Sequence, residues 1–130
     1  KTDVVAFHGV GGEWLSIDTP SFLQLLDFIV EKRDQLWVSD PIAIHKYETE
    51  RQSAEVRVLE STQSQIKLEL TTKADPAVYD APLTLITQVP ADWKTVQMTQ
   101  GKHTASAMAK EGKVMFEAMP GEDAVVLKNR

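Results

Sequence analysis

The sequence contains no cysteine. The chain therefore has no disulfide framework and no thiolate metal site, and its redox compartment stays open. Its three histidines, His8, His45 and His103, are too far apart in sequence to form a ligand pair on one element. The residues of this chain alone predict no bound cofactor and no metal site.

Long hydrophobic runs and basic stripes are also missing. The longest apolar stretch, Phe22 to Val30, is interrupted by Gln24 and Asp27, and it is too short to cross a membrane. The net charge of −5 argues against a nucleic-acid partner. Acidic residues are in excess in residues 1–53, which carry nine Asp and Glu against five Lys and Arg. We expect neither a membrane nor a nucleic acid among the partners.

Residues 1–52 follow a strand–helix–strand–helix pattern. Residues 3–7 and 36–38 are short apolar runs typical of buried strands. Thr19 followed by Pro20 predicts the start of a helix, and an amphipathic pattern continues to residue 29. Asp40 and Pro41 give the same signal for a second helix, which we expect to end near Arg51 with Ile44 and Tyr47 inward.

The pattern changes at residue 54, where short alternating segments begin. We expect seven strands separated by turn residues, at about 54–59, 66–70, 83–89, 93–99, 103–109, 114–118 and 124–127. This spacing predicts an antiparallel, immunoglobulin-like β-sandwich over residues 54–130. The fold class is therefore α+β and mostly β, with a short βαβα segment followed by the sandwich.

Two strands and two helices make a poor hydrophobic core by themselves. We therefore expect residues 1–52 to be the last portion of a larger α/β domain. The alternative is that this segment packs onto the sandwich as one α+β unit. Unpaired strands in residues 1–52 would recruit other chains, which predicts a homodimer through this segment.

His8 is the strongest candidate for chemistry. It stands where a predicted buried strand ends and a loop with Gly9, Gly11 and Gly12 begins, and α/β folds bind ligands at such strand ends. Glu13 and Asp18 could orient its imidazole. The alternative is a structural histidine satisfied by a backbone carbonyl.

Aromatic residues are few and offer a second set of candidates. Trp14, Trp37, Trp93 and Tyr79 could stack on sugar rings. For Trp37 and Trp93 a place in the core is favoured. Trp14, in the glycine-rich loop, could line the mouth of a substrate-binding site.

Residues 3–52 resemble the closing segment of polysaccharide deacetylases of the NodB-homology type, carbohydrate esterase family four. The resemblance rests on VVAFHGVGG at 4–12, TPSFLQLLDF at 19–28, RDQLWV at 33–38 and YETER at 47–51. A later stretch, YDAPLTL at 79–85 with VPADW at 89–93, looks like the β-rich tail that follows the catalytic domain in some members.

The resemblance implies a distorted (β/α) barrel that removes acetyl groups from amino sugars or xylan with a divalent metal, most often zinc. Within it, His8 matches the histidine that acts as general acid on the leaving group. A polysaccharide substrate and a secreted or periplasmic location are implied as well.

The family's paired-aspartate motif and its His-x-x-x-His metal motif are absent from this sequence. We therefore expect the chain to be inactive alone and to depend on an N-terminal catalytic portion that carries those motifs. A non-catalytic carbohydrate-binding or structural β-sandwich module is the alternative.

Overall fold

A computed structural model describes residues 2–121 and 123–130 of the chain. The chain divides into two compact units, Lys1–Ser39 and Asp40–Arg130. The second helix belongs to the same unit as the strands, whereas the predicted boundary between residues 52 and 54 separates it from them. Each unit is described below by itself.

Helix α1 (Thr19–Glu31) lies in the first unit. Its N-cap is Asp18, whose carboxylate accepts a hydrogen bond of 2.9 Å from the backbone N–H of Ser21. The predicted cap, Thr19, is already helical, so that assignment was one residue late. Asp18 is extended, and its side chain therefore reaches back to an unpaired N–H of the first turn.

The two strands predicted in this unit are absent. Residues 3–7 and 36–38 form no strand, and most of their side chains are exposed, including Val4 at 77% and Trp37 at 58%. A strand needs a neighbour to pair its N–H and C=O groups, and the described part of this unit supplies none to either segment. The predicted βαβα arrangement is therefore not present, and Trp37 is not a core residue.

The second unit begins with α2 (Pro41–Ser53), and its predicted cap is confirmed. The carboxylate of Asp40 accepts hydrogen bonds from the N–H groups of Ile42 and Ala43 at 2.9 and 3.0 Å. Ile44 and Tyr47, both expected to face inward, are half-buried, and Tyr47 packs against the core. Neither helix in the described residues is long and apolar enough to cross a membrane.

All seven predicted strands are confirmed, each with ends within two residues of the expected ones. They are β1 (Glu55–Ser61), β2 (Gln65–Thr71), β3 (Leu83–Gln88), β4 (Thr95–Gln100), β5 (His103–Met108), β6 (Lys113–Ala118) and β7 (Val125–Asn129).

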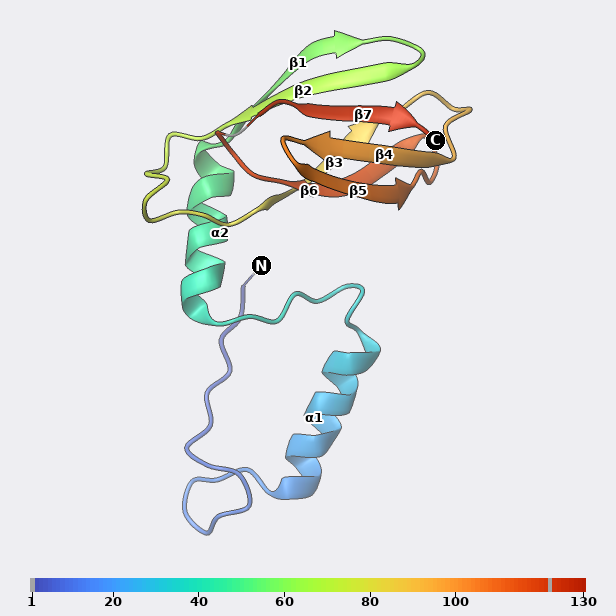
Figure 1. Cartoon of the computed structure of the whole chain (residues 1–130). Helices are drawn as coiled ribbons and strands as arrows, with labels where there is room; N and C mark the ends of the chain where they lie inside the picture. Colours follow the sequence, from blue (N-terminus) through green and yellow to red (C-terminus); the bar gives the residue numbers. More distant parts are fainter. Residues whose placement is uncertain (1, 122) are drawn as a thin grey trace. The chain divides into compact units, whose positions relative to one another are not determined.

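The strands form two antiparallel sheets, one in the order β1-β2-β7-β4-β5 and the other β3-β6 (Figure 1). In an immunoglobulin constant domain the seventh strand pairs with the sixth. Here β7 lies between β2 and β4. The strand order therefore differs from the immunoglobulin-like one, because turn signals give the number of strands but not their long-range partners.

A hydrophobic core lies between the two sheets. It includes Leu68 and Leu127 from the larger sheet and Val114 from the smaller one, all at most 2% exposed. The edge strand β1 differs, since Val56 and Val58 stand opposite the buried Leu70 and Leu68 but remain 50% and 61% exposed. Alternation along β1 predicted the strand correctly, but burial also requires a second layer to cover it.

Candidate functional site

The loop that follows His8 is closed by its own backbone. The N–H of Gly11 donates to the carbonyl of Ile17 at 2.9 Å, and the N–H of Ile17 donates to the carbonyl of Gly9 at 3.1 Å. Gly11 has φ +70°, and a Cβ there would lie 2.7 Å from Oγ1 of Thr19. A side chain at Gly11 would therefore be strained and would push against the start of α1.

Along the chain, His8 lies between this loop and Phe7, whose ring packs against α1. The ring of Phe7 meets that of Phe22 on α1 edge-on, with centroids 5.3 Å apart. The imidazole of His8 is exposed and meets the ring of Trp14 at 6.1 Å and 70°. The structure therefore brings together the two candidates that the sequence singled out in this region, His8 and Trp14, the latter 78% exposed.

The carboxylates expected to orient His8 do not do so. Asp18 instead caps α1, and the hydrogen bonds from the backbone and side chain of Ser21 lower the pKa of its carboxyl group. Within residues 2–121 and 123–130, the His8 imidazole forms no hydrogen bond or ion pair with a carboxylate, Glu13 included, or with a backbone carbonyl. The imidazole is therefore open to a ligand.

The described residues contain no group of three or more His, Asp or Glu side chains that could hold a metal ion. A lone imidazole beside a tryptophan supplies one nitrogen ligand, and catalytic zinc sites use three protein ligands. The residues present in the structure therefore do not fit a resident metal, and we assign no chemical step through one to them.

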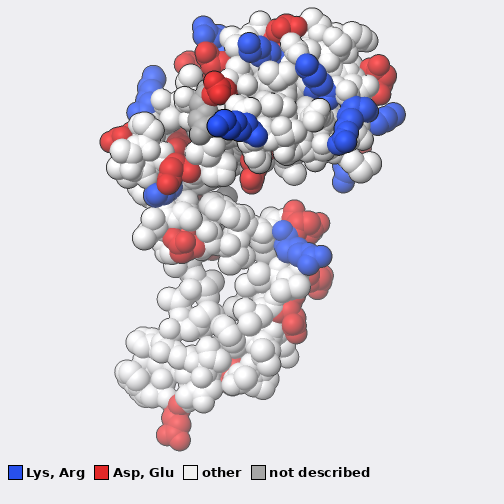
Figure 2. Space-filling view, viewed as in Figure 1, with Lys and Arg blue, Asp and Glu red and all other residues white. Residues whose placement is uncertain are grey.

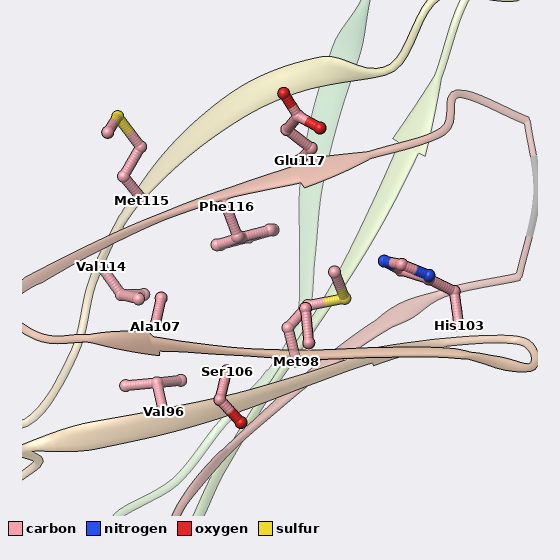
Figure 3. A pocket seen from close by; sticks show the side chains of 10 residues that line it. Val96, Met98, His103, Ser106, Ala107, Val114, Met115, Phe116 and Glu117 are labelled. Carbon is pink, nitrogen blue, oxygen red and sulfur yellow. The ribbon is translucent and has the colours of Figure 1, made fainter. Parts of the chain in front are cut away.

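A cavity of about 180 Å³ lies between β5 and β6 in the second unit (Figure 3). The two strands meet at a tight turn in which Glu111 and Gly112 both have positive φ, at 52° and 69°. They then diverge, β5 into the larger sheet and β6 into the smaller one. Small side chains at Ala105 and Ala107 leave space in the gap.

This cavity is mainly apolar, with polar groups at its margin. Val114 and Phe116 point from β6 into the gap, while Glu117 points to the other side of the strand (Figure 3). His103, the first residue of β5, is exposed. No base, nucleophile and orienting group come together among these described residues, so we assign no reaction to the cavity.

Two further aromatic candidates lie in the second unit. Trp93 is 2% exposed, and its indole N–H donates to the carbonyl of Gln63 at 2.9 Å, which confirms it as a core residue. Tyr79 is half-buried beside His45, with ring centroids 6.1 Å apart. Neither ring is exposed as a platform on which a sugar could stack.

Glu50 is a buried carboxylate on α2 that no sequence pattern indicated. It is 1% exposed, and Oε2 has no hydrogen-bond partner among the described residues. Burial raises the pKa of Glu50, and the nearby Asp80 acts in the same direction. The backbone N–H of Ala81 and the charge of Lys46 oppose the rise, although Lys46 forms its own ion pair of 2.6 Å with Asp80.

We expect Glu50 to make the second unit less stable as the pH rises. A carboxyl group whose pKa is higher in the folded state contributes stability below its unfolded pKa and loses it as the pH rises through the folded pKa. Glu50→Gln should therefore be more stable than the wild type at pH 7, by about 1 kcal/mol, and should flatten the pH dependence above pH 4.5. Urea unfolding at a series of pH values measures this.

The matched control is Glu117→Gln, which removes the same charge from an exposed position on β6. This variant should keep the wild-type pH dependence. A Glu50→Gln variant with the same pH slope as the wild type would show that Glu50 is not the group responsible.

Comparison with known proteins shows a similarity to a gellan lyase. No protein-family profile and no solved structure matches the chain. A gellan lyase from Bacillus sp. is 28% identical over 105 residues, which cover 78% of this chain and 4% of that protein. The matched part of this chain is longer than Asp40–Arg130, so it includes residues of both units. The chain thus spans a small fraction of the length of this curated relative.

Proposed function

We propose that this chain is part of a polysaccharide deacetylase: residues 1–52 close its catalytic domain, and residues 54–130 form an accessory β module. The motifs of residues 3–52 support the catalytic assignment. The similarity to a gellan lyase supports a polysaccharide as the class of substrate.

The observation that carries the proposal is the setting of His8. Its imidazole is exposed, it has no carboxylate partner in the described part of the chain, and it lies beside Trp14 at the head of a loop closed on itself. A general acid must reach the leaving group of a bulky substrate, so an open imidazole suits it. The indole of Trp14 offers an apolar face on which a sugar ring can stack.

This chain supplies one part of the proposed reaction. His8 would protonate the departing sugar oxygen or nitrogen as the bond to the acetyl carbon breaks. The divalent metal and the aspartate base that the family uses would be held by residues other than those described here, because the described residues form no metal-binding cluster. The 130-residue chain alone should therefore release no acetate.

A second candidate is a non-catalytic module. The relative that shares the matched region is named for a lyase reaction. The matched region makes up 4% of that protein. A region that makes up so small a part of an enzyme suits an accessory element that binds or positions a polysaccharide. In that case His8 and Trp14 would contact sugar without taking part in a reaction.

Acetate release tests the proposal. The natural protein that carries this segment should release acetate from acetylated xylan or from N-acetylglucosamine oligomers. A chelator should abolish the release, and added zinc should restore it. If that protein cleaves polysaccharide to unsaturated sugar ends and releases no acetate, it is a lyase and the deacetylase proposal is wrong.

A further inference from the structure

The outer side of the five-stranded sheet carries a cluster of cations that the proposed reaction does not use. Along β2 and β7 the side chains of Lys67 and Lys128 alternate with the buried residues and so project away from the core. Arg130 continues this alternation beyond β7, and its N–H donates to the carbonyl of Thr95 at 2.9 Å. We call Lys67, Lys128, Arg130 and the neighbouring Gln65, Gln97 and Thr95 the basic face.

The strand register places these side chains close together. Lys128 stands opposite Gln65 on one side and Gln97 on the other, in one row across three strands. Neighbouring strands are roughly 4.8 Å apart, and side chains two residues apart on one strand are separated by roughly 6.7 Å. Lys67 is one row away from Lys128, and Arg130 is one row away on the other side.

Of the three cations, Lys67 stands opposite a carboxylate, that of Glu60 on β1, whereas Lys128 stands opposite two glutamines. None of Lys67, Lys128 and Arg130 forms an ion pair or side-chain hydrogen bond with another described residue. The acidic groups on the same side are Glu55 and Glu60 on β1 and Glu69 at the adjoining end of β2. Glu69 is paired with Arg57, and Glu60, which lies opposite Lys67, accepts a hydrogen bond of 3.2 Å from Gln65.

This basic cluster belongs to a chain whose net charge is −5. In Figure 2 the Lys and Arg side chains visible in this view lie mainly over the unit that holds the strands. A positive surface retained on an acidic protein favours a partner with fixed negative charges. The amide groups of Gln65 and Gln97 beside Lys128, and the hydroxyl group of Thr95 beside Arg130, can also hydrogen-bond to the hydroxyl groups of such a partner.

We propose that the basic face binds a carboxylated polysaccharide, that is, a chain rich in uronic acid. The proposal rests on the proposed function only in taking a polysaccharide as the ligand; the carboxylate follows from the cations. A nucleic acid fits less well, because three cations neutralise few phosphates and the face has no aromatic side chain on which bases could stack.

The test compares two forms of one polymer. Polygalacturonate carries free carboxylates, whereas fully methyl-esterified polygalacturonate has the same sugar backbone without charge. The 130-residue chain should bind the free form, measured by affinity electrophoresis and calorimetry, and should bind the ester at least about tenfold more weakly. Added salt should weaken binding to the free form.

Two charge-matched double variants locate the site. Lys67→Gln with Lys128→Gln should lower the affinity for polygalacturonate about tenfold. Lys73→Gln with Lys110→Gln removes the same charge from exposed loop and turn positions outside the basic face, and it should bind as the wild type does. Equal losses in both double variants would show that net charge, not this face, governs binding, and would overturn the proposal.

The remaining outcomes are also decisive. Equal affinity for polygalacturonate and its methyl ester would overturn a carboxylate site. A single-stranded DNA oligomer that binds as tightly as polygalacturonate would assign the face to phosphate instead. If the ester and neutral xylan are bound and the free acid is not preferred, the basic-face proposal falls while a polysaccharide function stands. If no polysaccharide is bound, the basic-face proposal fails, and acetate release then decides the proposed function separately.

Discussion

Replacing His8 by alanine is expected to lower the rate of acetate release by roughly 10²–10⁴-fold, the usual contribution of a general acid. The exposed imidazole beside Trp14 is the group in the described chain that would deliver a proton to the leaving sugar. The measurement is the turnover of an acetylated oligosaccharide by the natural protein that carries this segment, with the metal content determined on the same samples.

The metal content separates the roles that His8 could have. A loss of turnover with unchanged metal content supports a general acid, whereas loss of both would make His8 a metal ligand. Unchanged turnover would remove His8 from the mechanism. Trp14→Ala is the companion variant, and it should raise the KM for the oligosaccharide more than it lowers kcat, because stacking contributes to binding rather than to proton transfer.

Replacing Trp93 by alanine should destabilise the second unit by about 3–5 kcal/mol. The indole is 2% exposed within the core, and its N–H is satisfied by the carbonyl of Gln63. Alanine would leave a cavity in the core and an unpaired carbonyl at Gln63. Urea unfolding followed by far-ultraviolet circular dichroism measures the loss.

Two control variants show whether the lost stability comes from the core position of Trp93. Trp93→Phe keeps most of the apolar volume and loses the hydrogen bond, so it should cost less than alanine. Trp14→Ala, at a position that is 78% exposed, should leave the unfolding free energy almost unchanged. A Trp93→Ala variant as stable as the wild type, with weakened polysaccharide binding, would contradict the core assignment and make Trp93 a stacking platform.

The sequence-based predictions were correct where the interactions that form an element lie within a short segment. Asp40 and Pro41 predicted the start of α2 because a capping carboxylate and a proline act on N–H groups within the same turn. The seven strands of residues 54–130 were predicted because alternation and turn residues are properties of short segments. The helix at Thr19 was also found, but its cap was placed one residue late, since Asp18 and Thr19 are both good capping residues.

Features that depend on distant partners were not predictable in the same way. Residues 3–7 have a strand-like composition, but a strand forms only where another strand pairs with it. The order β1-β2-β7-β4-β5 depends on pairing between residues far apart in the sequence. The same limit explains Trp37, which was expected in the core because it lies in an apolar run and yet is exposed.

The same distinction between neighbouring and distant residues holds for the candidate site. The sequence by itself identified His8, Trp14 and the glycines that let the loop turn, because these residues are neighbours in the chain. Only the tertiary structure decided that the His8 imidazole meets Trp14 and no described carboxylate, that Glu50 is buried, and that Lys67, Lys128 and Arg130 share one side of a sheet. Burial and strand register are set by contacts between segments that are distant in the sequence, so no local pattern contains them.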